Sequence, residues 1–120
     1  MNTTNKSLTN ELPVYLESYD LLKYLMKLIV GLPRDIKFIY GMDLKDNAFA
    51  LVANIYFANI LKEQRALYIN KSIANLKFIN LMIRLSRDLN YIKDNQYVFV
   101  IKLSGSINKQ LHGWKSTYIQ

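Results

Sequence analysis

Hydrophobic residues recur every three or four positions between residues 13 and 30, which is the spacing of one face of an α-helix. Pro13 suits the first turn of such a helix, because its missing N–H would have no partner there. Gly31 is placed to end the helix in the left-handed conformation that glycine adopts without steric penalty. The pattern predicts a first helix from about residue 13 to residue 30.

After a short link, Pro33 opens a second predicted helix that continues to about residue 61. Its hydrophobic positions occupy more than one face, so a single seam between two helices cannot cover them all. Such a helix is covered either by three neighbours in a bundle or by another subunit. We therefore expect an oligomer interface on this helix and take Ile55, Phe57 and Ile60 as its candidate residues.

A polar break over residues 62–65 precedes a third run of helical spacing, which continues as far as Asn90, a residue suited to cap it. Asp94 is a good N-cap for a fourth helix that would end at Gly113. The run YVFVI at residues 97–101 has strong β propensity, but a lone strand would have no partner here. The chain is thus predicted to be all-α, an up-down-up-down four-helix bundle.

The length of 120 residues fits one domain, which we place at residues 12–117 between a flexible arm at 1–11 and a tail at 118–120. The arm lacks the apolar core of a signal peptide. The most apolar stretch, residues 48–61, is shorter than the ~18 to 20 residues that cross a bilayer. With no cysteine, the chain needs no oxidising compartment. We expect a cytoplasmic protein without membrane association.

The net charge of +7 is confined to the second half of the chain. Residues 1–60 carry six Lys or Arg and six Asp or Glu, whereas residues 61–120 carry ten and three. This asymmetry favours an anionic partner for the second half. The alternative is that the excess charge serves only solubility.

The sequence offers little for catalysis or metal binding. A nucleophile needs a base beside it, and the single histidine, His112, stands near the end of the fourth helix, where a structural role is expected. One histidine and no cysteine exclude an ordinary zinc site, and Asp43 and Asp46 lack partners for a carboxylate metal site. The four glycines are too widely spaced for a phosphate loop. We expect no enzymatic activity, no cofactor and no metal.

Basic residues form a candidate nucleic-acid surface on the third and fourth helices. Lys77 and Arg84 are seven residues apart, which returns them to nearly the same helix face, and Arg87 lies one turn further. Lys102 and Lys109 repeat the seven-residue spacing on the fourth helix. Nearby in sequence are Asn70, Lys71, Asn80, Lys93 and Lys115. Without a base-reading motif, contacts would follow shape and charge, and the alternative is an ordinary solvated face.

Short motifs along residues 12–117 resemble the accessory variability determinant family of diversity-generating retroelements, which also includes four-helix bundle proteins encoded in intervening sequences of bacterial 23S ribosomal RNA. The order and spacing of the motifs carry the resemblance. They are Leu12-Pro13-Val14-Tyr15, Tyr19-Asp20-Leu21-Leu22-Lys23, Leu32-Pro33-Arg34, Lys37-Phe38 with Tyr40-Gly41, Ile83-Arg84-Leu85 with Asp88-Leu89, and Gly113-Trp114-Lys115-Ser116.

This resemblance implies a basic, ring-like homopentamer that partners a reverse transcriptase and its template and flanking RNA, and possibly cDNA, during error-prone cDNA synthesis. It implies basic contacts at Arg34, Lys37 and Arg84. The segment Ser104-Gly105-Ser106 differs from the family pattern and gives the fourth helix a weaker interior. Two alternatives stay open: a ribosomal intervening-sequence protein of unclear role, and a purely structural oligomer.

Overall fold

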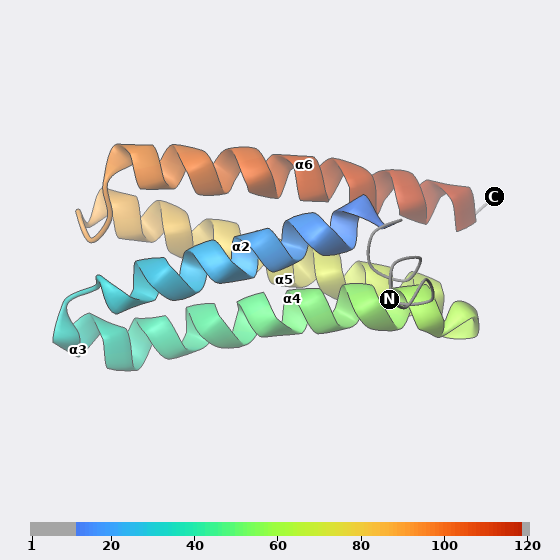
Figure 1. Cartoon of the computed structure of the whole chain (residues 1–120), viewed down its shortest axis with the longest axis horizontal. Coiled ribbons are helices and arrows are strands. Elements are labelled where there is room, and N and C mark those ends of the chain that lie inside the picture. The colour runs from blue at the N-terminus through green and yellow to red at the C-terminus, as the bar shows by residue number, and fades with distance from the viewer. Residues whose placement is uncertain (1–11, 119–120) are drawn as a thin grey trace, which may run out of the picture.

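The computed structural model describes residues 12–118, so the predicted arm at 1–11 and the last two residues lie outside the described part. Four long helices run up and down in turn (Figure 1), which confirms the predicted all-α bundle. They are α2 (Pro13–Val30), α4 (Met42–Ile60), α5 (Arg65–Asp88) and α6 (Asp94–Tyr118).

Each helix packs against two neighbours around one core. α2 and α5 each contact α4 and α6, and the pairing of α4 with α5 is the most extensive. Every helix contributes fully buried side chains, among them Leu21, Leu51, Ile79 and Ile107. The core therefore uses one stripe of each helix and leaves the opposite stripe facing outward. None of the helices in the described residues combines the length and apolarity needed to span a membrane.

The predicted second helix is interrupted by one wide turn. It comprises α3 (Arg34–Ile36), the π-helical η1 (Lys37–Gly41) and α4. The Tyr40 hydroxyl in this turn donates to the Met82 carbonyl and also contacts the Ser86 hydroxyl, which ties η1 to α5. Burial raises the pKa of Tyr40, because it disfavours the charged phenolate.

The end of α2 differs from the prediction. Gly31 has a φ of −83°, in the right-handed region, and its N–H donates to the Leu28 carbonyl at 3.1 Å. The expectation of a left-handed glycine was wrong, since Pro33 ends the helix by disfavouring helical backbone at the residue before it. The cap at Asn90 is confirmed: it has a φ of 63°, and the next N–H donates to the Ser86 carbonyl at 2.8 Å.

Both ends of α6 also differ from the prediction. Asp94 is the first helical residue, and the Lys93 N–H just before it donates to the Gln96 side chain at 2.8 Å. The helix continues past Gly113 to residue 118. Trp114 explains this, because its half-buried ring packs against the core and beneath Arg65, whose Cζ lies 5.6 Å from the ring centroid. Tertiary packing thus outweighs the weak helix propensity of glycine.

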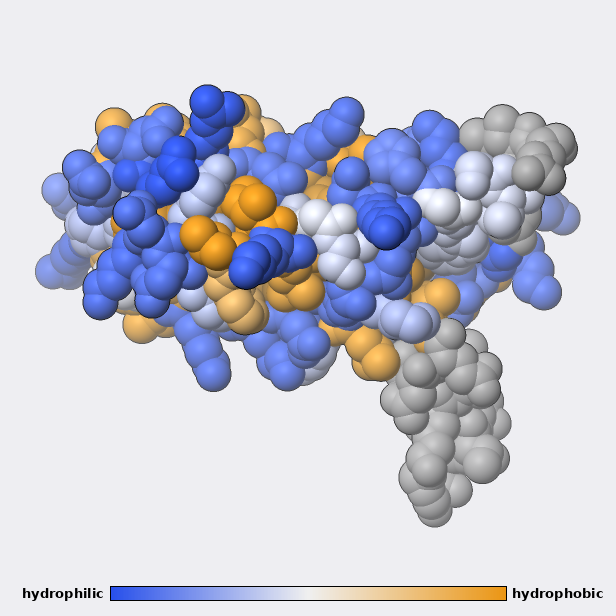
Figure 2. Space-filling model, turned by 90° about the horizontal axis from the view of Figure 1, so that it is seen from above, coloured by the Kyte–Doolittle hydropathy of each residue, from blue (hydrophilic) through white to orange (hydrophobic). Residues whose placement is uncertain are grey.

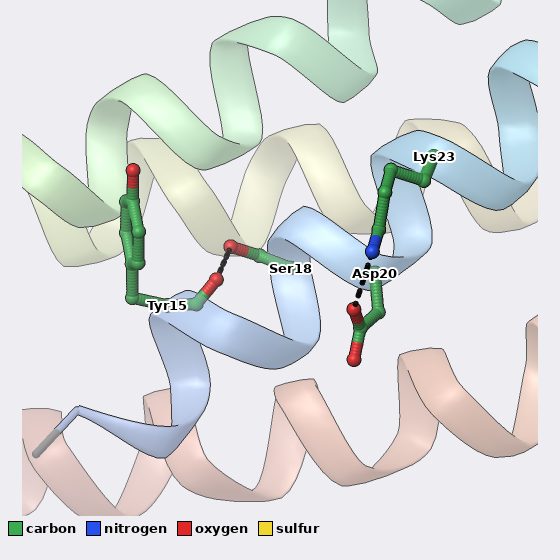
Figure 3. A network of polar contacts seen from close by, with 4 residues as sticks. All are labelled: Tyr15, Ser18, Asp20 and Lys23. Atoms are coloured by element: carbon green, nitrogen blue, oxygen red, sulfur yellow. Dashed lines mark hydrogen bonds and ion pairs between the residues drawn. The ribbon is translucent and has the colours of Figure 1, made fainter. Parts of the chain in front are cut away.

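Two polar contacts on α2 form within the helix itself. Ser18 is buried, and its hydroxyl donates to the Tyr15 carbonyl at 2.7 Å (Figure 3). The Lys23 ammonium lies 3.5 Å from the Asp20 carboxylate, and both side chains are exposed. α2 therefore contributes a paired charge to the surface.

Candidate nucleic-acid interface

Two side-chain contacts establish how α5 and α6 align. The Ser104 hydroxyl donates to the Asn80 side chain at 2.6 Å, and the Arg87 guanidinium lies 4.0 Å from the centroid of the Tyr97 ring. Asn80 and Arg87 are seven residues apart on α5, and Tyr97 and Ser104 are seven residues apart on α6. The helices therefore run antiparallel in a single register over this length.

This register pairs the basic residues of the two helices. Along the bundle axis, Lys77 is level with Lys109 and Arg84 with Lys102, with the same offset in both pairs. All four side chains are exposed. We call this set the basic face. Viewed onto α6, the surface is predominantly hydrophilic, with hydrophobic side chains scattered between (Figure 2).

Little acidic charge accompanies these four cations on their own helices: α5 ends with Asp88, four residues after Arg84, and α6 begins with Asp94. Neither residues 65–87 of α5 nor residues 95–118 of α6 include an Asp or Glu. Within the described residues, the ion pairs are Lys23 with Asp20 and Arg87 with Asp88, and neither involves the basic face. Its charge is therefore available to an external anion, and phosphate oxygens are suitable acceptors.

The other predicted residues on α5 and α6 have different environments. Arg87 is half-buried, stacked on Tyr97 and 3.4 Å from the Asp88 carboxylate, so its charge is partly compensated. Lys71 is exposed but six residues from Lys77, which places it about 120° away round the helix. Its ammonium lies over the Tyr68 ring, 5.1 Å from the centroid. Of the two flanking asparagines, Asn70 is exposed and Asn80 is engaged by Ser104.

Arg34 and Lys37 lie apart from the basic face. Arg34 is exposed on α3, and Lys37 is half-buried in η1, beside α2 and α4. Lys37 contributes to a cavity of about 240 Å³. The other lining residues are Ile29, Phe38, Gly41, Met42 and Lys45. The basic residues predicted from the sequence therefore lie in two separate regions of the fold.

The candidate oligomer residues separate in a similar way. Ile55 is fully buried on the core side of α4, so its assignment to an interface was wrong. Phe57 and Ile60 are 38% and 42% exposed and are available to a partner. Ile55 lies on the same face of α4 as Leu51, which packs inward. The helical spacing of the apolar residues on this face was the signal that could have identified it as the core side.

Most residues of an exposed apolar stripe on α4 were not predicted individually from the sequence. Met42, Phe49, Ala53, Tyr56 and Ile60 are all exposed and spaced by three, four or seven residues, as on one helix face. We call this set the α4 seam. A similar stripe on α5 comprises Leu67, Ala74, Phe78, Leu81 and Leu85. The heptad spacing in both stripes was the signal that could have identified them.

An apolar groove of about 460 Å³ runs beside the α4 seam, between α4 and α2. The residues lining it are Tyr15, Tyr19, Leu22, Phe49, Val52, Ala53, Tyr56 and Phe57. Exposed apolar surface on this scale is typical of protein–protein contacts.

The residues considered for catalysis are dispersed. His112 is exposed on α6, and Asp43 and Asp46 are exposed on α4. Among the residues that the structure describes, no three His, Cys, Asp or Glu side chains gather as a metal site would require.

Comparison with known proteins adds no relative. No model of a known protein family matches the chain, and no curated protein matches it either.

Proposed function

We propose that this chain is a non-enzymatic accessory protein of a diversity-generating retroelement, acting as a basic oligomer. It binds the reverse transcriptase and template RNA and so supports error-prone cDNA synthesis. The ordered motifs over residues 12–117 and the four-helix architecture support this assignment.

The observation that carries the proposal is the basic face. It comprises four exposed cations from two adjacent helices, whose acidic residues are confined to Asp88 at the end of α5 and Asp94 at the start of α6. A solvated surface usually mixes charges of both signs, whereas a phosphate-binding surface is unbalanced in this way. The absence of a base-reading motif agrees with contacts made chiefly to the backbone of the RNA.

Assembly is supported by a different surface. The α4 seam and the α5 stripe expose large hydrophobic side chains on faces that the bundle does not cover. Burying them against other copies would remove apolar area from water, and two unlike faces suit a head-to-tail, ring-closing contact. A ring-like homopentamer follows from the family resemblance.

RNA binding by charge-matched variants tests the proposal. Replacing Lys77, Arg84, Lys102 and Lys109 by Gln removes the basic face. Replacing Lys23, Lys27, Lys45 and Lys62 by Gln removes equal charge elsewhere. We expect the first variant to lose most affinity and to flatten the slope of log affinity against log salt by up to ~2.8 to 3.6, at about 0.7 to 0.9 per phosphate contact. Equal losses in both variants would contradict a localised interface.

The α4 seam favours a second candidate, a purely structural oligomer. That candidate predicts an assembled wild-type protein with no measurable affinity for RNA. The ribosomal intervening-sequence alternative is separated by gene context. A reverse transcriptase gene and a pair of near-identical repeats beside this gene are expected for a retroelement, and a position inside a 23S ribosomal RNA gene would overturn that assignment.

A further inference from the structure

A glycine lies inside the basic face without a role in packing. Gly105 is exposed in the interior of α6, three residues after Lys102 and four before Lys109. The residue before it, Ser104, bonds Asn80 of α5. A Cβ added at Gly105 would meet nothing within 4 Å.

The fold therefore does not require this glycine. Glycine is among the least favourable residues in a helix interior, and a larger residue would fit here. Glycine is retained where another backbone or a ligand approaches closely. Gly105 thus forms a low point between the surrounding cations, at which a partner could approach the helix itself.

The backbone positions of the four cations lie in two rows, one on α5 and one on α6. Within each helix they are seven residues apart, which is roughly 10.5 Å along the axis. The helix axes of adjacent packed helices are about 8 to 10 Å apart. Phosphates matching all four positions must lie in two rows held at a fixed separation.

Most aromatic rings near the basic face are engaged within the protein. Arg87 lies over the ring of Tyr97 and Arg65 over that of Trp114. Phe99 is 47% exposed, but it packs on Tyr24 of α2 at a centroid separation of 4.2 Å. Phe78, the exposed ring on α5, lies about 100° round the helix from Lys77 and belongs to the α5 stripe. Stacking on aromatic rings is the usual means of holding single strands without sequence preference.

We infer that the basic face binds duplex nucleic acid in preference to single strands, through phosphates on both strands and a close approach at Gly105. This inference rests on the nucleic-acid binding proposed above and names the class of nucleic acid. A duplex holds two rows of phosphates rigidly, so binding does not have to order them. A single strand would have to be ordered on a surface whose aromatic rings are mostly engaged within the protein.

The test measures fluorescence anisotropy of the full chain with labelled probes of one sequence, about 16 nucleotides or base pairs long. The probes are single-stranded RNA, an RNA duplex, an RNA–DNA hybrid and a DNA duplex, each titrated at several salt concentrations. We expect at least one duplex to bind roughly tenfold tighter than the single strand. The ranking of the three duplexes identifies which helical form is the target.

Two glycine variants provide the matched comparison. Gly105→Gln places a long side chain within the basic face, whereas Gly113→Gln places it beyond Lys109 on the same helix, also in open space. We expect the first to weaken duplex binding roughly fivefold and the second to change it less than about twofold, with helix content unchanged in both. Single-strand binding should be little affected by either.

The possible results distinguish failure of the duplex preference from failure of nucleic-acid binding. Binding of the single strand as tight as that of every duplex would overturn the inference and leave RNA binding in place. Unchanged duplex affinity in Gly105→Gln would overturn the close approach at this residue. Failure of all four probes to bind would overturn both the inference and the proposed function.

Discussion

The outward faces of α4 and α6 differ completely, although both helices contribute similar side chains to one core. Fully buried Leu51 and Ile55 line the inner side of α4, as Val100 and Ile107 do for α6. The outer side of α4 is the apolar seam, whereas Lys102, Gly105 and Lys109 occupy the outer side of α6. The inward faces specify the bundle, and the outward faces distinguish a surface suited to protein from one suited to phosphate.

Charge balance shows the same difference. The acidic residues Asp43 and Asp46 accompany Lys45 on α4, whereas α6 has no carboxylate after Asp94. The surface of α4 is therefore close to neutral, and that of α6 is uniformly positive. The two faces should respond to different perturbations, with α4 sensitive to polarity and α6 to salt.

The largest effect is expected from two substitutions that compare the inner and outer sides of α4. Ile55→Asp places a charge in the core, so we expect a loss of more than about 4 kcal/mol and an unfolded chain by circular dichroism. Ile60→Asp changes an exposed position, so the helices should persist while sedimentation shows a smaller species. An Ile60→Asp protein with wild-type sedimentation would remove Ile60 from the interface.

A pair of glutamate substitutions compares the two outward faces directly. Ala53→Glu and Ser106→Glu each add one carboxylate at an exposed position within a helix. We expect Ser106→Glu to weaken nucleic-acid binding by about 1 kcal/mol, through Coulomb repulsion near the basic face, without changing assembly. Ala53→Glu should reduce assembly and leave the salt slope of binding unaltered. Both variants showing the same pattern would mean that the faces are not functionally distinct.

A third prediction concerns the turn between α3 and α4, where Tyr40 joins η1 to α5. Tyr40→Phe loses the hydroxyl contacts and should cost about 1 kcal/mol, since Ser86 keeps its own bond to the Met82 carbonyl. Because burial raises the pKa of Tyr40, the wild type keeps this stabilisation below pH ~10 and loses it as the pH rises further. Urea unfolding at pH 8 and above pH 10 should show this decline in the wild type and a smaller one in Tyr40→Phe.

The smallest effect is expected on α2, where the charges are paired. Asp20→Asn removes the carboxylate beside Lys23, and since both side chains are exposed the loss should be about 0.2 to 0.5 kcal/mol. Nucleic-acid affinity should change far less than in Ser106→Glu, where the carboxylate is introduced among unpaired cations. A comparable change in both would indicate that net charge, and not its position, governs binding.

Hydrophobic periodicity predicted the four helices because each must bury one apolar stripe, and that requirement is written into residue spacing. It predicted the bounds of α2, at about residues 13 and 30, and the cap at Asn90, two residues after α5 ends at Asp88. It missed the wide turn at η1 and the continuation of α6 beyond Gly113. Those features depend on Tyr40 reaching α5 and on Trp114 packing with Arg65, contacts between residues distant in sequence.

For the candidate sites, the sequence alone determined that positive charge accumulates after residue 60 and that the second helix carries more apolar residues than one seam can cover. Only the tertiary structure decided which of these residues face outward. It placed Ile55 in the core, stacked Arg87 on Tyr97 and set Lys77 and Arg84 level with the lysines of α6. The physical reason is that charge and periodicity are properties of single segments, whereas exposure and register arise only when helices pack against one another.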